Sequence, residues 1–565
     1  MCSLTELTEL VEQLAREFAQ TGATAGTLSL HQSRFGNGLS QSSLVGAMAP
    51  MQPTRTGDLL RTVRAELGAG ITDVLQMRLR LAGDSYEFQY RCTSETDADH
   101  SWDFATQLIL DPDYRYPGHA RPTTEVVAGA PDDRPTDADT LAAFGAMVRE
   151  YVDLYSEING SAPEFGAGYT EQAIAAAEAR IGLRLPEDLR ALYRLVGYEG
   201  DDRGLLGFTR LYRLDHVAEA YQHGDNDQLR LNCGPAGAGA WDDSLFASSR
   251  VVVEAWPHDT VRRISRSPYW VIIGNSDRTV YAVDLNPGPC GQHGQLIGFE
   301  TSGWYSARCV ADSVSQLLQR RIDSLRAEAK AEESEDRSDS GATAPQYSRH
   351  LSSADGPIAS LDDRFAVQEL EILDRDFVDA DELTVLPMLR ILTVWGVRAA
   401  NLAVPHDIPL EHLTIKGSRI DLAPLAGHPT LWDVRLGGAE YPVRIGSLAT
   451  VKSLQRLDIS GVDVVDLEVL ADLPNLRVLV ANSRQWRDLS AQDAIPPRLA
   501  AAELTDEVSF ETEIAWAADL GVQSELAALP VIRGTLSNVQ RVQEPTDPDS
   551  YVESLMNSLE QQFES

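Results

Sequence analysis

The stretch "YTEQAIAAAEARIGLRLPEDLRALYRLVGYEG", residues 169–200, carries two helical patterns that are separated by a break at Leu185-Pro186. Thr170 precedes the first pattern and fits an N-cap, because its hydroxyl can accept a hydrogen bond from a free N–H of the first turn. Pro186 fits the first turn of the second helix, where a missing N–H does no harm, and a glycine follows that helix. The stretch therefore predicts two consecutive short helices.

Two further patterns follow this helix pair. The text "YWVIIGNSDRTVYAVDLNPG", residues 269–288, predicts a hairpin in which an apolar strand ends at Ile273-Gly274 and returns through polar residues as "VYAVDL". The text "VADSVSQLLQRRIDSL", residues 310–325, predicts a closing amphipathic helix. Helices and a hairpin in this order predict a domain of the α+β class.

The order of these patterns resembles the SUKH superfamily, the Smi/Knr type of domain. The resemblance implies a domain that binds proteins, and bacterial members are similar to immunity proteins that occupy the active site of a toxin, often a nuclease. Fungal relatives imply a regulatory scaffold instead. The segment 231–267 is longer than the corresponding loop of the family. The resemblance rests on Glu178, Leu185, Pro186, Tyr193, Gly197, Asp284, Leu285, Ala311 and Ser313.

The N-terminal segment reads as a second α+β domain. Apolar residues at positions 7, 10, 11, 14 and 18 predict an amphipathic helix, and alternating apolar positions in 73–83 and 86–94 predict strands. A second helix is expected over 140–158. This order resembles small immunity-protein families of toxin systems, the YezG-like type among them.

The C-terminal segment carries an internal repeat, in which Leu-x-x-Leu-x-Leu frames recur at nearly constant spacing. The spacing falls within the range typical of leucine-rich repeats and predicts a solenoid, since no single repeat could bury its apolar face alone. The face formed by the strands either binds a partner or is only the surface of a curved scaffold. Its candidate contacts are Thr393, Trp395, Thr414, Lys416, Arg435, Asp458 and Ser460. The frames begin at Val367, Leu389, Leu410, Leu431, Leu454 and Leu476.

The expected organisation is therefore multidomain α+β. We expect an N-terminal α+β domain (1–118), a linker (119–140), a SUKH-type domain with its leading helix (141–325), a disordered linker (326–360), leucine-rich repeats (361–500), and a capping helix with an acidic tail (501–565).

Composition restricts the class of partner. The 565 residues carry 85 acidic and 48 basic side chains, a formal charge of −37, which repels phosphate backbones and anionic lipid and attracts basic proteins. The acidity can also serve only solubility. Five scattered cysteines, acidic residues near Met1 and the lack of a run of about 18 apolar residues predict a reduced, cytoplasmic protein that binds neither nucleic acid nor membrane.

Motifs of catalysis are absent from the sequence. The stretch "CGPAGAGAW" (233–241) lacks the lysine of a phosphate-binding loop, and "DPDYRY" (111–116) reads as a turn more readily than as a cation site. The stretch "NPGPCGQHG" (286–294) offers a cysteine and a histidine but no orienting carboxylate. We therefore expect no enzyme, no cofactor and no metal ion.

The sequence thus predicts a protein-binding module, either an immunity protein that neutralises a basic toxin domain or a regulatory scaffold. The partner is expected to meet acidic and aromatic residues of the SUKH-type segment and the strand face of the repeats. For the residues of the SUKH-type segment, the alternative interpretation is a solvated loop without a partner. The expected contacts are Tyr198, Glu199, Asp201, Asp202, Asp215 and Trp304, with Trp395, Lys416 and Arg435 on the repeats.

Overall fold

The computed structural model describes residues 4–20, 24–33, 36–45, 73–94, 107–111, 113–119, 131–132, 134–199, 204–223, 251–265, 267–276, 279–300, 307–331, 348–352, 355–375, 377–401, 403–506, 508–522 and 531–537. They form two compact units: unit 1 comprises Met1–Asp111 and Leu457–Ser565, and unit 2 comprises Pro112–Arg456. The division falls inside strand β19 (Arg456–Gly461). Both units contain helices and sheets, which confirms a multidomain chain of mixed α and β structure.

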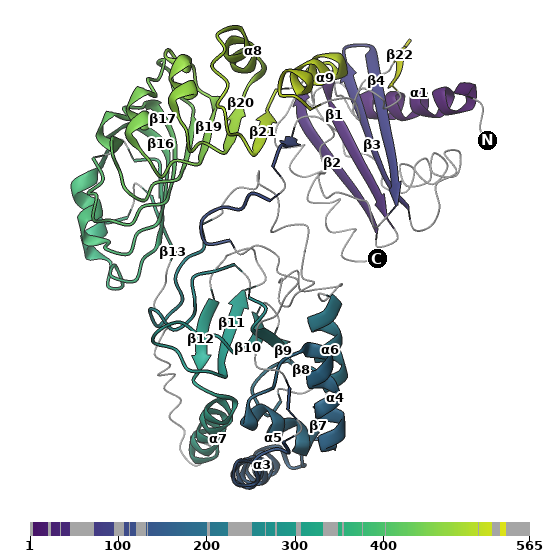
Figure 1. The fold of residues 1–565 in the computed structure, drawn as a ribbon, viewed down its shortest axis with the longest axis vertical. Coiled ribbons are helices and arrows are strands. Elements are labelled where there is room, and N and C mark those ends of the chain that lie inside the picture. Colours follow the sequence, from purple (N-terminus) through teal and green to yellow (C-terminus); the bar gives the residue numbers. More distant parts are fainter. Residues whose placement is uncertain are drawn as a thin grey trace. The chain divides into compact units, whose positions relative to one another are not determined.

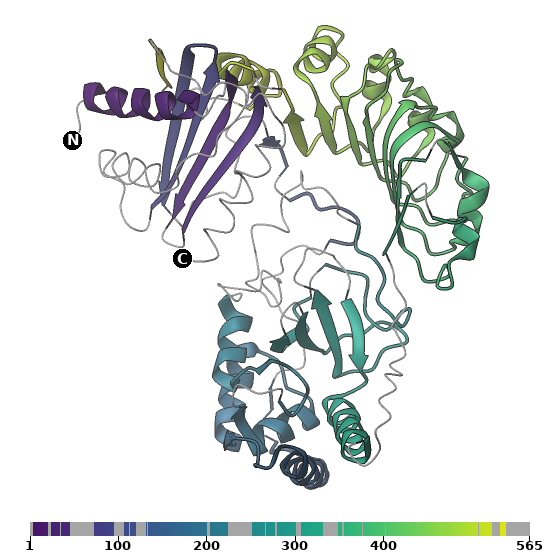
Figure 2. The same cartoon turned by 180° about the vertical axis from the view of Figure 1, so that it is seen from behind.

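Unit 1 is built on an antiparallel sheet with the order β2-β1-β3-β4-β22 (Figure 1 and Figure 2). The predicted amphipathic helix, α1 (Leu4–Gln20), buries one apolar face at Leu7, Val11, Leu14 and Phe18 in the same core as strand residues such as Phe88. The strands are β1 (Ala25–Ser33), β2 (Gly36–Val45), β3 (Asp73–Ala82), β4 (Ser85–Ser94) and β22 (Val531–Thr535).

Helix α9 (Phe510–Asp519), in the C-terminal part of unit 1, contacts this sheet. Arg78 of β3 forms a buried ion pair with Glu513, and its guanidinium lies 4.4 Å from the centroid of the Phe510 ring. Strand β22 adds to the edge of β4, with Val531 opposite Gln89. Unit 1 also holds β20 (Val478–Ala481), α8 (Ser483–Ala491), β21 (Ala501–Leu504) and β5 (Gln107–Ile109), which is antiparallel to β21.

The first half of unit 2 combines helices with an antiparallel sheet of order β12-β11-β10-β9-β8. The helices are α3 (Ala138–Asn159), α4 (Glu171–Ile181), α5 (Glu187–Leu195), α6 (Leu214–His223) and α7 (Val314–Ala331). The strands are β8 (Arg210–Leu211), β9 (Trp270–Ser276), β10 (Thr279–Asp284), β11 (Gln295–Glu300) and β12 (Ala307–Ala311), and a separate pair joins β6 (Phe165–Ala167) to β7 (Val196–Glu199).

The predicted helix pair is present, with one difference at its end. Thr170 caps α4 by accepting a hydrogen bond from the Ala173 N–H, and Gly182 ends the helix in a left-handed conformation. Pro186 is the N-cap of α5 rather than a residue of its first turn. Helix α5 ends at Leu195 without a glycine cap, because the chain enters the extended backbone of β7 directly.

The predicted hairpin and closing helix are also present. Strands β9 and β10 are antiparallel, with Trp270 opposite Asp284, and α7 packs its apolar side, including Leu318, into the same core. Trp270 and Tyr193 are among the largest fully buried side chains of this core. Among the described helices, none has the length and apolar character needed to cross a bilayer.

The second half of unit 2 repeats one strand and one 3-10 helix. Strands pair in parallel in the order β13-β14-β16-β17-β18, and Leu370, Leu392, Leu413 and Val434 stand opposite one another on successive strands, one repeat apart. The strands are β13 (Ser348–Leu351), β14 (Glu369–Leu373), β16 (Ile391–Asn401), β17 (His412–Arg419) and β18 (Asp433–Gly437), with β15 (Phe377–Asp379) beside β16. The 3-10 helices of unit 2 are η1 (Ile358–Ser360), η2 (Ala380–Val385), η3 (Ala423–Leu425) and η4 (Gly446–Thr450), and η5 (Leu467–Asp472) belongs to unit 1.

Candidate functional site

A groove of about 810 Å³ opens in the first half of unit 2. One wall is the connection from α4 to α5, residues 183–188, and the facing wall is the loop between β10 and β11, with Leu285, Asn286, His293 and Gly294. Tyr269, Thr140 and Ser313 complete the lining. The groove therefore mixes apolar surface with a few polar groups, as sites for another molecule usually do.

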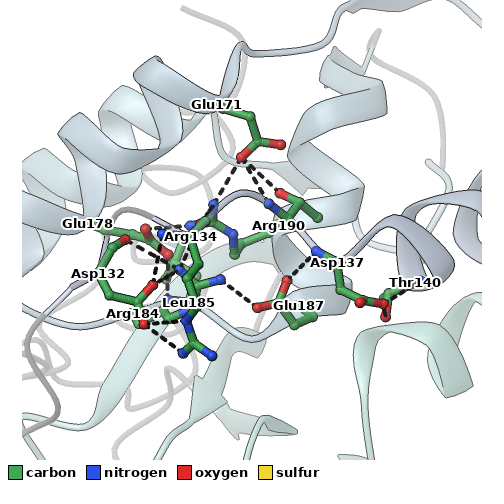
Figure 3. A network of polar contacts seen from close by, with 11 residues as sticks. Asp132, Arg134, Asp137, Thr140, Glu171, Glu178, Arg184, Leu185, Glu187 and Arg190 are labelled. Atoms are coloured by element: carbon green, nitrogen blue, oxygen red, sulfur yellow. Dashed lines mark hydrogen bonds and ion pairs between the residues drawn. The ribbon is translucent and has the colours of Figure 1, made fainter.

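The first wall is held by a buried carboxylate on α4. Glu178 accepts a hydrogen bond of 2.8 Å from the Leu185 N–H and pairs with the guanidinium of Arg190 (Figure 3). Arg190 is 1% exposed and also contacts Glu171 at 2.9 Å. A buried charge is tolerated only when it is paired and hydrogen-bonded, so these contacts fix the connection relative to both helices.

The charged side chains that line the groove carry a net negative charge. Of the residues lining the groove, Arg184 is the one that carries a full positive charge, and it lies 2.6 Å from both Asp132 and Glu187. Glu187 also accepts a hydrogen bond from the Asp137 N–H, as Figure 3 shows. Asp188 accepts hydrogen bonds from the N–H groups of Leu189 and Ser315. Two carboxylates thus neutralise Arg184, and Asp188 adds a further negative charge to the lining.

The second wall is held by another buried carboxylate. Asp284, at the end of β10, accepts hydrogen bonds from the Asn286 N–H at 3.0 Å and from Gln295 Nε2 at 3.1 Å, and burial raises its pKa. Gly294 has a φ of 87°, and a Cβ there would lie 3.0 Å from Pro186 Cγ on the facing wall. A glycine is therefore favoured where the two walls approach each other.

Six of the nine residues that carried the family resemblance line this groove or hold its walls. Leu185, Pro186, Leu285 and Ser313 line it, and Glu178 and Asp284 hold its two walls. Tyr193, Gly197 and Ala311 lie elsewhere in the domain: the hydroxyl of Tyr193 donates to the Tyr212 carbonyl in the core, Gly197 lets β7 approach β6, and Ala311 is buried.

Tyr198 and Asp215, two expected contact residues, each contact another side chain of the same domain. Arg213 places its guanidinium 4.9 Å from the centroid of the Tyr198 ring, and Asp215, which follows shortly after it, accepts a hydrogen bond of 3.1 Å from the Tyr169 hydroxyl. Tyr198 is 40% exposed. Neither Tyr198 nor Asp215 lines the groove. They form a second surface, which we call the Tyr198 patch.

Glu199 differs from the exposed position that the sequence suggested. It is only partly accessible, its carboxylate accepts a hydrogen bond of 2.6 Å from the Leu205 N–H, and burial raises its pKa to about 7. The other three expected contacts of this segment, Asp201, Asp202 and Trp304, lie outside the described residues.

The expected contacts on the repeats are neighbours. Trp395 stands opposite Lys416 on the next strand, with the Lys416 Nζ 4.3 Å from the ring centroid, and Thr414 stands opposite Arg435. Trp395 is 40% exposed, and Arg435 is tied to Asp433 at 3.0 Å. Thr393 pairs with Thr414 in register. Asp458 and Ser460 belong to unit 1, where the Ser460 hydroxyl donates to Asp458.

Sequence analysis missed a buried ion cluster beside these contacts. His412 Nδ1 lies 2.8 Å from Asp433 Oδ2, and its Nε2 lies 2.9 Å from the Thr414 hydroxyl. Although burial opposes ionisation, Arg435 and Arg456 hold the pKa of Asp433 well below its usual range, and burial lowers the pKa of His412. The cluster bonds neighbouring strands to each other. His412, Asp433 and Arg456 follow the repeat period, so aligning the repeats would have revealed it.

Three side chains that could bind a metal ion lie close together in the segment 251–265. Glu254, His258 and Asp259 can each offer one ligand atom within 4.8 Å of the others. His258 Nε2 lies 2.6 Å from Glu254, and its Nδ1 lies 3.1 Å from Asp259. Because the two ring nitrogens point at different carboxylates, this arrangement is a chain of polar contacts, and Glu254 also pairs with Arg390.

The remaining motifs have structural roles or lie outside the described residues. Within "DPDYRY", the Tyr114 hydroxyl donates to Gln455, and the Tyr116 ring stacks on Trp432 with centroids 5.1 Å apart. The glycine-rich stretch 233–241 lies outside the described residues.

One comparison with known protein families agrees with the sequence patterns of residues 168–320. Residues 168–320 match the model of the SMI1 / KNR4 family (SUKH-1), which confirms the resemblance for this segment. No curated protein matches the chain. Among solved structures, an internalin C2 and an internalin (inlF) of Listeria monocytogenes are similar to 28% of this chain at 21% and 15% identity, covering 69% and 54% of their own chains, each with a TM-score of 0.20.

Proposed function

We propose that this chain is a non-catalytic, cytoplasmic immunity protein, in which the SUKH-type segment neutralises a toxin domain by direct binding. The observation that carries the proposal is the convergence of the family's residues on the groove, which most of them line or hold. The family that matches residues 168–320 is associated with immunity proteins of polymorphic toxin systems.

The charge of the groove selects the kind of partner. Arg184 is paired with Glu187 of the lining and with Asp132, and Asp188 adds one further negative charge to the lining. The whole chain carries a formal charge of −37. Opposite charge steers association, by about 10 to 1,000-fold in rate at low salt. We therefore assign to the groove a lysine- or arginine-rich segment of the toxin domain, such as a nuclease exposes towards phosphate.

The proposed organisation follows the sequence analysis. A SUKH-type α+β domain (141–325) lies, in sequence, between an N-terminal α+β domain and a leucine-rich-repeat solenoid, and the solenoid offers a second binding surface at Trp395, Lys416 and Arg435. That surface favours one alternative function, a regulatory scaffold that joins two different proteins, because an exposed aromatic ring beside a cation is typical of an interface.

Co-expression with a toxin domain that is encoded by a neighbouring gene tests the proposal. Cells that produce this toxin domain should survive when they also produce the full chain, and purified chain and toxin domain should form a complex that weakens as salt increases. Survival without a complex would exclude direct neutralisation. The absence of protection would exclude the immunity function, and binding to a non-toxic neighbour would then favour the scaffold.

Charge variants at exposed positions locate the binding surface. His293 lines the groove and is exposed, so His293→Lys should slow association with a basic partner, while His293→Glu and His293→Gln keep it at or above the wild-type rate. Asp215→Lys makes the same kind of change on the Tyr198 patch. If Asp215→Lys slows association and His293→Lys does not, the partner binds the Tyr198 patch instead of the groove.

A further inference from the structure

One backbone turn recurs in successive repeats and makes their side chains comparable. In each turn a backbone N–H donates to the carbonyl of the residue three positions earlier in the same repeat. The donors stand at corresponding positions of the repeats. One of these positions holds a histidine that is 1% exposed, and the others hold buried aliphatic residues. The donors are Leu386, Ile408, His428, Val451 and Leu473.

His428 is therefore an imidazole in a column of aliphatic side chains. Both of its ring nitrogens are buried, and neither has a hydrogen-bond partner among the described residues. Buried polar groups are almost always satisfied, so the two orphaned nitrogens point to a partner that the described side chains do not supply, such as a water molecule or a metal ion. Burial, and next the proximity of His406, lower the pKa of His428 to about 4, so its ring is neutral near pH 7 and keeps a lone pair.

His406 of the preceding repeat lies next to this ring. The two ring centroids are 5.4 Å apart, and the ring planes meet at 74°. A tetrahedral zinc ion, with Zn–N bonds of about 2 Å, places the centroids of two ligating imidazoles about 5 Å apart. The space beside Gly427 is loosely filled, because a Cβ at this residue would have only His406 Cε1 within 4 Å, at 3.9 Å, apart from its chain neighbours.

We infer that His406 and His428 form a binding site for a transition-metal ion of the zinc class, in which water completes the coordination. Imidazole is the side chain that zinc, copper and nickel share as a ligand. The ion would satisfy one nitrogen of His428 and link two adjacent repeats. Sequence analysis expected no metal because it searched for ligands close together in the chain, whereas His406 and His428 are separated by a whole repeat.

The group at Glu254, His258 and Asp259 is the competing explanation for any metal bound by the chain. Its side chains are already paired with one another and with Arg390, and those of His258 and Asp259 are 50% and 51% exposed. It therefore offers no buried orphaned atom comparable to those of His428. His258→Ala removes this group without touching the repeats and serves as the matched control.

Cobalt(II) and zinc(II) added to the full chain, without a polyhistidine tag, test the inference. Co²⁺ should give visible absorption bands that saturate with ion, zinc should displace it, and His258→Ala should behave as the wild type. His406→Ala should weaken binding at least tenfold, and His428→Leu should abolish it. Since the equivalent positions hold aliphatic residues, His428→Leu should also raise the metal-free thermal midpoint, which shows that the variant folds.

Three outcomes would overturn the inference. The wild-type chain binds neither ion, or His428→Leu binds cobalt as the wild type does, or binding is lost in His258→Ala alone. The inference is independent of the proposed toxin partner, because the readout uses only the metal ion and the isolated chain.

Discussion

Arg190 of α5 lies with its guanidinium against the carboxylate of Glu178 on α4, and both side chains are removed from solvent. The same carboxylate holds the Leu185 N–H in the connection between the helices. One ion pair therefore sets both the angle between two helices and the position of one groove wall.

Replacing Arg190 by Ala should show that the groove wall depends on the ion pair with Glu178. Removal of one partner leaves an uncompensated buried charge, which costs about 3 to 5 kcal/mol. We expect faster hydrogen exchange in α4, in α5 and in the connection 183–188, measured by mass spectrometry on the full chain. Arg134→Ala is the control, because that side chain is 75% exposed and solvent screens its salt bridge with Asp132. Equal exchange in Arg190→Ala and wild type would show that the wall does not depend on the pair.

The raised pKa of Glu199 leads to a prediction of how the stability of unit 2 depends on pH. Burial raises the pKa of Glu199 from 4.5 to about 7 in the folded chain. Between these values the folded state binds more protons than the unfolded state, so stability falls as pH rises, by up to about 3 kcal/mol. Glu199→Gln keeps an acceptor for the Leu205 N–H and cannot ionise. Thermal midpoints at pH 5 and pH 8 should differ less in this variant than in wild type, and identical differences would contradict the assignment.

Trp395 tests whether the repeats share the partner of the groove. Truncation of an interface aromatic typically costs about 2 kcal/mol or more of binding free energy, roughly a 30-fold loss of affinity. Trp395→Ala should therefore weaken binding to the toxin domain while the thermal midpoint stays nearly constant. Phe365→Ala is a matched control, since Phe365 is also exposed and has the Arg364 guanidinium 4.4 Å from its ring centroid. Equal losses in both variants, or none in Trp395→Ala, would place the partner elsewhere.

Local patterns were sufficient to predict the elements of the groove but not the groove itself. The cap at Thr170 and the hairpin from Trp270 to Asp284 follow from residues near each other in sequence. The approach of Gly294 to Pro186 depends on how distant elements pack, and no local pattern encodes that distance. The family resemblance supplied the residues of both walls, because it reflects the packed fold rather than local propensity.

For the repeats, the sequence predicted the period but not the contacts between side chains of adjacent strands. Their period and their apolar positions are written in the sequence, and the parallel register of Leu370, Leu392 and Leu413 follows from them. The cluster around His412 and Asp433 depends on contacts between adjacent strands, which become visible only when the repeats are aligned column by column. Glu199 was misjudged as exposed because its burial depends on the nearby Gly204 and Leu205 rather than on its own strand.

The pairing of β22 with β4 has a consequence for biosynthesis. Val531 is paired with Gln89, so most of the chain separates the two strands in sequence. At a translation rate of about 5 to 20 residues per second, the partner of β4 emerges about 20 to 90 s after β4 itself. During that interval a nascent chain presents an unpaired strand edge, the kind of surface that recruits other strands. Ribosome-associated chaperones therefore have a defined target on this chain, and crowding of polysomes should raise the yield of misassembled protein.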